Sequence, residues 1–246
     1  MKAIGVIPAR YSSVRFEGKV LADLMGKPMI QHVWESAKKA KALDELVVAC
    51  DDDRIYKVVS DFGGRAVMTA KAHTSGTERI AEVVADIDVR LVVNIQGDEP
   101  LIHPSMIDDV VYSLTNSPEL PVATIMKRIE DEKEIPDANV VKVVVNKKGY
   151  ALYFSRSPIP FVREEEPGMR VHYKHIGLYG YTKDFLFTYK NLPASKLENL
   201  EKLEQLRILE NGYPIRVIET KYETIGVDTR EDLEKVRQWM VVKSRM

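Results

Sequence analysis

Short apolar runs alternate with amphipathic stretches along the first half of the chain. The apolar runs, which have the length of strands, occupy residues 2–8, 45–50, 65–69, 90–95 and 121–127. Apolar positions three and four apart predict helices between these runs, at about residues 28–40, 53–62, 75–84 and 104–114. This alternation predicts an α/β fold with a doubly wound, mostly parallel sheet and right-handed crossovers.

Antiparallel signals mark the second half of the chain. Residues 140–155 are typical of a hairpin, and two more strands are predicted at residues 175–182 and 214–220. Neither a linker nor a repeat divides the chain, so we expect one domain over residues 1–246. The antiparallel elements predict a smaller insertion within that domain, at about residues 130–190.

Two helices are predicted near the end of the chain. Leucines recur every third residue over 197–209 and predict one helix. Because that spacing drifts around a helix axis, we expect this helix to contact more than one surface. Thr229 is a suitable cap for a last helix, whose apolar residues are Leu233, Val236 and Trp239.

The composition is that of an ordinary globular protein. The net charge is −1, with 30% charged and 45% hydrophobic residues, which argues against general binding to nucleic acid. Cys50 is the single cysteine, so an intramolecular disulfide and a thiolate metal cluster are excluded. Pro8 and Arg10 interrupt the first apolar run, and no run has the length of a membrane span. We therefore expect a soluble, cytoplasmic protein without membrane insertion.

A cationic loop follows the first predicted strand. Arg10, Arg15 and Lys19 stand four or five residues apart there, at the carboxyl end of the strand, where α/β folds bind ligands. The segment has neither a G-x-G-x-x-G pattern nor a Walker lysine motif. Three cations can still hold a triphosphate, since each contributes ~4 kcal/mol of attraction at an effective dielectric near 20, before desolvation. The alternative is a solvated surface loop.

Two aspartates each follow an apolar strand. Asp98 emerges from residues 90–95 after a Gly97 turn, and Asp228 ends the apolar stretch before Thr229. Carboxylates at this sheet edge suit Mg²⁺, which takes oxygen ligands and shares itself with substrate phosphates. Each aspartate has an alternative role, Asp98 in its turn and Asp228 as a helix cap.

Further polar residues could contact a substrate. Ser75, with Glu78 three residues on, fits a capping box, and the helix start offers free N–H groups to an anion, with Arg79 one turn in. In the second half, polar residues in apolar surroundings could bind a polyhydroxylated acid. These residues are Arg156, His175, Glu204 and Gln205. A histidine on a strand can equally be structural.

The motifs taken together resemble the CMP-Kdo synthetases, the 3-deoxy-manno-octulosonate cytidylyltransferases of lipopolysaccharide biosynthesis. The matching stretches, in family order across nearly the whole chain, are VIPARY, GKPMIQHVWESA, SGTERI, VVNIQGDEPLI, YFSRSPIP, HIGLYGY, LEQLRILENG and GVDTREDLEKVR. The resemblance implies a Rossmann-like nucleotidyltransferase fold, a homodimer built through the antiparallel region, and a Mg²⁺ requirement.

The resemblance also implies roles for individual residues. CTP would be bound by Ala9, Arg10, Arg15, Lys19, Ser75, Arg79 and Gln96. Mg²⁺ would be held by Asp98 and Asp228, which with Arg15 and Lys19 make the catalytic set. Kdo would be bound by Arg156, His175, Tyr179, Glu204 and Gln205. Arg156 and His175 would fix the carboxylate of the sugar acid.

Two segments depart from the family pattern. The family commonly has R-L-P-G-K-P-L where this chain has RFEGKVL at residues 15–21, so both prolines are lost and Glu17 is added. The cations survive, which predicts that phosphate binding survives, whereas the stiffness of the loop is open. AKAH at residues 70–73 also departs from the family, and His73 is assigned no role.

The expected reaction is attack of the anomeric hydroxyl of Kdo on the α-phosphate of CTP, giving CMP-Kdo and pyrophosphate. Three alternatives stay open at this stage. They are a cytidylyltransferase for sialic acid, a sugar-1-phosphate nucleotidyltransferase and a nucleotide sensor without catalysis. A sugar-1-phosphate enzyme needs a further basic cluster, and a sensor is expected to have lost Asp98, Asp228 or the cations.

Overall fold

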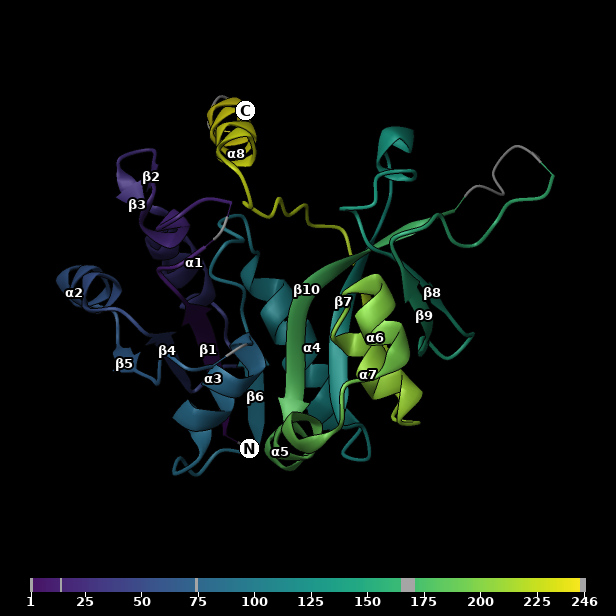
Figure 1. Ribbon diagram of the computed structural model, residues 1–246, viewed down its shortest axis with the longest axis horizontal. Helices are drawn as coiled ribbons and strands as arrows, with labels where there is room; N and C mark the ends of the chain where they lie inside the picture. Colours follow the sequence, from purple (N-terminus) through teal and green to yellow (C-terminus); the bar gives the residue numbers. More distant parts are fainter. Residues whose placement is uncertain (1, 14, 74, 165–170, 244–246) are drawn as a thin grey trace.

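The computed structural model describes residues 2–13, 15–73, 75–164 and 171–243. Within these ranges nine strands form one mixed sheet (Figure 1), whose main path runs β11-β7-β10-β6-β1-β4-β5. Its strands are β1 Ala3–Ala9, β4 Glu45–Cys50, β5 Ala66–Met68, β6 Leu91–Asn94, β7 Val122–Arg128, β8 Lys142–Val145, β9 Ala151–Ser155, β10 Tyr173–Thr182 and β11 Ile215–Thr220. Two short strands, β2 Asp23–Leu24 and β3 Lys27–Pro28, pair separately.

Along the main path of the sheet, four of the six neighbouring pairs run parallel. β1 pairs in this way with β4 and β6, β4 with β5, and β11 with β7. The predicted α/β class and mostly parallel sheet are therefore confirmed. β10 runs antiparallel between β6 and β7 and so joins the two parallel halves of the sheet.

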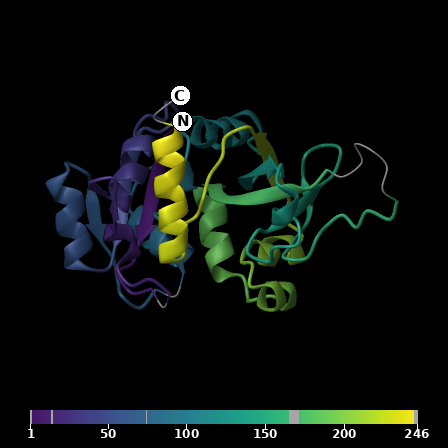
Figure 2. The ribbon, with the colours of Figure 1, turned by 90° about the horizontal axis from the view of Figure 1, so that it is seen from above.

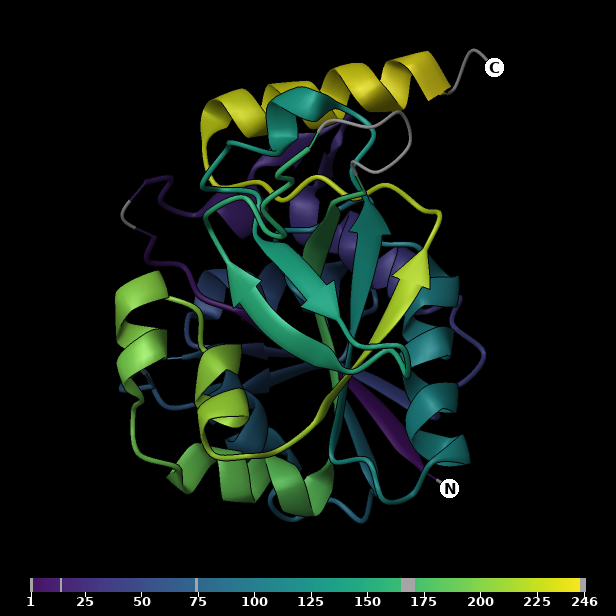
Figure 3. The same ribbon diagram turned by 90° about the vertical axis from the view of Figure 1, so that its right-hand side faces the viewer.

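The predicted hairpin is also present. β8 and β9 pair antiparallel, and β8 pairs with the start of β10. The hairpin lies in front of the main sheet when the molecule is viewed from its side (Figure 3). The antiparallel elements thus continue the main sheet through β10. The limits of the insertion at about residues 130–190 stay a prediction.

Helices cover both faces of the sheet. One face carries α1 Met29–Ala37, α2 Asp53–Asp61 and α4 Pro104–Asn116. The opposite face carries α3 Gly76–Val84, α5 Lys183–Asn191, α6 Lys196–Glu201 and α7 Gln205–Glu210. Leu91 and Val93 of β6 enter the first core and Val92 enters the second, because successive strand side chains alternate. The continuous apolar run of β6 follows from this double cover.

The single helix predicted over 197–209 is wrong. The chain forms α6 and α7 instead, and Lys202 between them adopts a left-handed conformation with φ of 54°. A straight helix cannot place leucines of three-residue spacing on one face. The break lets Leu203 and Leu206 enter the core, while Leu200 remains 70% exposed.

The helix α5 was not predicted from the sequence. Thr182 caps it by accepting a hydrogen bond from the Phe185 amide, at 3.3 Å. Phe185, Leu186 and Tyr189 are buried on one side of the helix. Their spacing of one and four residues was the available signal.

The last helix, α8 Arg230–Lys243, lies beyond the carboxyl ends of the parallel strands (Figures 1 and 2). A third core attaches it to the segment after β1 and to the start of α1. Its buried members are Phe16, Leu24, Met29, Val227, Leu233 and Val236. Trp239, which was predicted on the apolar face, is not a member of this core. No helix in the described ranges is long and apolar enough to cross a membrane.

Candidate active site

A cavity of about 270 Å³ lies at the carboxyl end of β1. Predicted site residues from widely separated segments line it, namely Ala9, Arg10, Lys19, Ser75, Arg79, Gln96, Asp98, Glu204 and Asp228. Lys19 begins the short 3-10 helix η1 Lys19–Leu21, and Asp98 follows β6. These segments meet because the parallel strands β1 and β6 are neighbours and end at the same edge of the sheet.

The two predicted metal-binding aspartates converge on Lys19. The Lys19 ammonium donates to Asp98 Oδ2 at 2.6 Å, to Asp228 Oδ1 at 2.9 Å and to the Val227 carbonyl at 3.0 Å. The two acid segments are also joined directly, since the Val227 amide donates to the Asp98 carbonyl at 2.9 Å. Burial lowers the pKa of Lys19, but the two carboxylates more than offset it, and the net pKa is raised.

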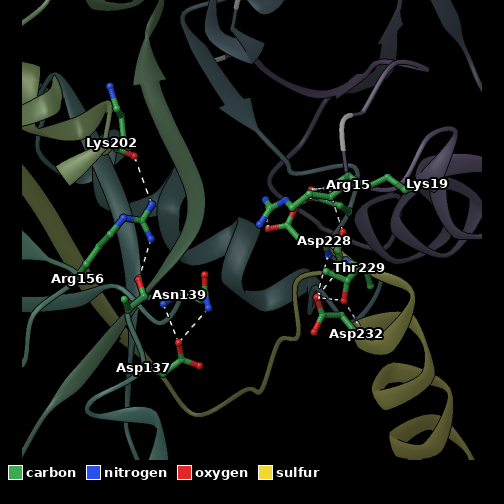
Figure 4. Close-up of polar contacts among 12 residues, drawn as sticks. Arg15, Lys19, Asp137, Asn139, Arg156, Lys202, Asp228, Thr229 and Asp232 are labelled. Carbon is green, nitrogen blue, oxygen red and sulfur yellow. Dashed lines mark hydrogen bonds and ion pairs between the residues drawn. The ribbon is translucent and has the colours of Figure 1, made fainter. Parts of the chain in front are cut away.

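Arg15 lies on the outer side of this cluster. Its guanidinium contacts Asp228 Oδ2 at 2.8 Å, and both side chains are at least half exposed. Figure 4 shows Arg15 and Lys19 together beside Asp228. Arg10 lines the cavity, and no ion pair of Arg10 is formed within the described residues. Among the described residues that line the first cavity, Arg10 is therefore the lysine or arginine that is not already paired with a carboxylate.

The start of α3 forms another wall of the same cavity. Ser75 caps the helix by accepting from the Glu78 amide, at 3.2 Å. Arg79 is only 3% exposed, and its guanidinium donates to Asp51 Oδ2 at 2.8 Å and to the Thr69 hydroxyl. Asp51 also accepts from the Tyr11 amide, at 3.2 Å. Arg79 thus ties α3 to the end of β4 and to the cationic loop.

A second cavity of about 250 Å³ adjoins the first, and Gly76, Gln96 and Glu204 line both. The predicted sugar-side residues His175, Tyr179, Glu204 and Gln205 line it. The Nε2 atom of Gln96 donates to the Gly177 carbonyl at 3.2 Å, which holds this amide between the two cavities. Ligands in the two cavities would therefore be neighbours.

Two polar groups of the second cavity have no hydrogen-bond partner among the described residues. They are the hydroxyl of Tyr179 and the Nε2 atom of Gln205, and both residues are more than nine-tenths buried. Leaving a buried polar group unpaired costs about 1–3 kcal/mol.

His175 and Glu204 complete the polar wall of the second cavity. The Nε2 atom of His175 lies 3.0 Å from the Thr124 hydroxyl, and Phe154 and Tyr179 enclose the ring. Burial lowers the pKa of His175 to about 3, so its imidazole is neutral near pH 7. Glu204 is an exposed residue, yet partial desolvation of its carboxyl group raises the pKa of that group. Glu204 Oε2 accepts from the hydroxyls of Thr77 and Tyr189, each at 3.4 Å.

Comparisons with known proteins show the family of the chain. Residues 4–225 match the sequence profile of a family described as Cytidylyltransferase. The chain belongs to this family. Two bacterial relatives are both named 3-deoxy-manno-octulosonate cytidylyltransferase. The one from Geotalea uraniireducens is 51% identical over 96% of this chain and 98% of its own. The one from Solibacter usitatus is 54% identical over 96% of this chain and 93% of its own.

A solved structure is also closely similar to this cytidylyltransferase. It is a CMP:2-keto-3-deoxy-manno-octonic acid synthetase in complex with CTP, with a TM-score of 0.93 and 45% sequence identity. The likeness covers 99% of this chain and all of the other. The predicted nucleotidyltransferase class and fold are therefore confirmed.

Arg156 of the cytidylyltransferase lies outside both cavity walls. Its guanidinium donates to the carbonyls of Glu201 at 2.7 Å, Ala138 at 2.8 Å and Lys202 at 3.5 Å. The Glu201 carboxylate in turn accepts from the Arg156 amide at 2.9 Å and from the Ser155 hydroxyl at 2.7 Å. Figure 4 shows Arg156 beside Lys202 and apart from the Arg15 cluster. In this conformation Arg156 fastens the end of α6 to the end of β9.

Sequence reasoning missed several contributors to the site. Asp51 orients Arg79, and Tyr189 and Thr77 orient Glu204. His73 lines the first cavity and pairs with Glu82. Tyr189 was missed because α5 was missed. Asp51 had a signal, since it directly follows the predicted strand that ends at residue 50.

Proposed function

We propose that this cytidylyltransferase transfers the cytidylyl group of CTP to the anomeric hydroxyl of Kdo for lipopolysaccharide biosynthesis. The products are CMP-Kdo and pyrophosphate. The observation that carries the proposal is the pair of adjoining cavities, one charged and one lined by unpaired polar groups, which share Gln96 and Glu204. The names of the full-length relatives supply the identity of the two substrates.

The first cavity is assigned to the triphosphate of CTP. The oxygen of the anomeric hydroxyl forms a bond to the α-phosphorus and loses its proton to water. The bond from that phosphorus to the bridging oxygen breaks, and pyrophosphate leaves with the bridging oxygen. Catalysis of this kind depends on positioning and on neutralising charge. Arg10, Arg15 and Lys19 would stabilise the negative charge on the leaving pyrophosphate.

Asp98 and Asp228 fit a Mg²⁺ site by their chemistry, because carboxylate oxygens are the ligands that this ion prefers. Within the described residues, no cluster of three or more His, Cys, Asp or Glu side chains could hold a metal ion. The two aspartates would therefore share the ion with phosphate oxygens and water. When bound, Mg²⁺ would supply further neutralisation of phosphate charge. The chain itself contributes Lys19, which keeps both carboxylates at one place.

The second cavity is assigned to Kdo. The unpaired groups of Tyr179 and Gln205 would bind its hydroxyls, with Glu204 as an acceptor. His175 is neutral and would act through a hydrogen bond, without charge. Arg156, proposed earlier as a ligand of the acid, would support the cavity by holding the turn at Lys202.

The reaction is tested by pyrophosphate release with CTP, ATP, GTP and UTP, each with Kdo and with sialic acid. We expect release with CTP and Kdo only. Release with sialic acid would favour the alternative acid, and CTP binding without any release would favour the nucleotide sensor. The sensor has less support, because Lys19, Asp98 and Asp228 are all present and in contact.

We further place the enzyme in the cytoplasm, where CTP is available, and propose that it is a homodimer. Leu152 on β9 and Leu200 on α6 are 61% and 70% exposed and are candidates for the interface. Light scattering is expected to give twice the mass of the 28.0 kDa chain. The mass of a single chain would contradict the dimer.

A further inference from the structure

We propose that Lys202 is the cation that binds the carboxylate of the sugar acid. This inference rests on the proposed function, because it concerns the acid substrate in the second cavity. Lys202 occupies the turn between α6 and α7 and lines that cavity. It matched none of the motifs that assign roles to its neighbours Glu204 and Gln205.

The first argument is the charge of the cavity wall. A substrate carboxylate is stabilised by a cation or by several strong donors. Lys202 is the one lysine or arginine among the described residues that line the second cavity. His175 lines it as well but is neutral, since burial keeps the pKa of its ring near 3. Lys202 is therefore the positive charge that the described wall offers.

The second argument is that the Lys202 ammonium is not held by another group, although its charge contributes to lowering the pKa of Glu198. No ion pair or hydrogen bond of this ammonium is formed within the described residues. The acids that flank it in sequence have partners of their own. The Glu201 carboxylate accepts from Ser155 and the Arg156 amide, Glu204 from Thr77 and Tyr189, and Glu198 from Arg207. The ammonium is thus available to a ligand.

The third argument is the backbone of Lys202. Its φ of 54° and ψ of 47° lie in the left-handed region, which costs a residue other than glycine of the order of 1 kcal/mol. Strained conformations of this kind persist where the surrounding structure holds them, and they gather at binding sites. Arg156 supplies part of the restraint, because its guanidinium donates to the Lys202 and Glu201 carbonyls. Arg156 is accordingly a positioning residue for Lys202.

The inference is tested with Lys202→Met, which keeps most of the length of the side chain and removes its charge. Lys202→Gly removes the charge and also relieves the strained backbone. Lys202→Arg keeps the charge, and Lys196→Met removes an exposed lysine from α6, the helix that precedes Lys202. Each variant is assayed for pyrophosphate release with Kdo and with its neutral carboxamide, and CTP is varied separately.

We expect both neutral variants to raise the KM for Kdo about fivefold, the effect of one partly hydrated charge at about 4 Å. The KM for the carboxamide and for CTP should stay within twofold of the wild-type values. Lys202→Arg and Lys196→Met should retain the wild-type preference for the acid over the carboxamide. A thermal melt of each variant checks that it is folded.

Two results would overturn the inference while leaving the proposed function intact. One is an unchanged KM for Kdo in both neutral variants. The other is an equal rise in KM for Kdo and for its carboxamide, which would mean that Lys202 affects the shape of the cavity and not the binding of the carboxylate. A wild-type enzyme that releases no pyrophosphate with Kdo would instead remove the proposed function itself.

Discussion

Replacing Asp98 by asparagine tests the charge arrangement at the centre of the site. Asp98 Oδ2 lies 2.6 Å from the Lys19 ammonium, and the two side chains are 28% and 14% exposed. Asparagine keeps the shape and one acceptor oxygen but removes the negative charge. Lys19 also keeps its contact with Asp228 at 2.9 Å. The variant therefore changes charge with little change in packing.

The expected magnitudes differ between stability and turnover. Losing one charge-assisted hydrogen bond while a neutral one remains should cost about 1 kcal/mol of folding free energy. In a chain of this size that lowers the melting temperature by about 2–4 °C. Turnover should fall about 10²–10³-fold, as it does when one preorganised electrostatic group is removed from an active site.

The assay is pyrophosphate release with CTP and Kdo over a range of Mg²⁺ concentrations, alongside CTP binding by calorimetry in EDTA. CTP binding without metal should be largely kept. Asp108→Asn serves as the control, since Asp108 is an aspartate outside both cavities whose carboxylate accepts from the Ala42 amide at 2.8 Å. It should lose stability to a similar extent but keep its turnover.

Full turnover of Asp98→Asn at ordinary Mg²⁺ would remove Asp98 from its proposed role. An equal loss in the Asp108 control would show that the assay reports general destabilisation. Loss of metal-free CTP binding would mean that Asp98 orders the nucleotide cavity by itself.

Three further predictions follow from individual contacts. Burial lowers the pKa of His175 from 6.5 to about 3, so the unfolded chain binds a proton that the folded chain does not as the pH falls below 6.5. The free energy of unfolding should therefore drop by about 1 kcal/mol for each pH unit below 6.5. Thermal melts at several pH values between 7 and 5 should show this drop for the wild type and a smaller drop for His175→Gln. Phe16 is 6% exposed, so Phe16→Ala should lower the free energy of unfolding by about 3 kcal/mol and reduce turnover. Phe16→Leu should keep most of the stability in thermal melts and most of the turnover in pyrophosphate assays. Glu223 pairs with Lys174 at 2.7 Å and Lys127 at 3.0 Å, so Glu223→Gln should lower the melting temperature by about 2–4 °C, and an unchanged melt would show that these pairs contribute nothing.

The structure shows how the cationic loop is held in place without the two prolines of the family pattern. Phe16 packs into the core that holds α8 and Val227. The Gly18 amide donates to the Tyr11 carbonyl at 2.9 Å, and the Arg54 guanidinium lies over the Tyr11 ring. Side-chain packing and backbone hydrogen bonds therefore hold the loop in this chain, which lacks the two prolines of the family pattern.

The sequence by itself determined the strands and helices of the first half of the chain and the edge of the sheet where the chemistry lies. Strand and helix periods are local properties, and they placed Lys19 and Asp98 after their strands without any knowledge of the fold. Asp228 was found because it follows an apolar stretch and precedes a helix, although the strand predicted for that stretch does not form. Charge and strand order were enough to predict that these residues meet.

Only the tertiary structure decided what each side chain contacts. Arg156 was predicted to bind an acid because it is a cation in an apolar stretch of sequence. In the structure its guanidinium donates to carbonyls of two other segments. Lys202 showed no signal because the break between α6 and α7 depends on which leucines the core accepts. Such choices depend on contacts between residues far apart in the chain, and the period of a local sequence carries no information about those contacts.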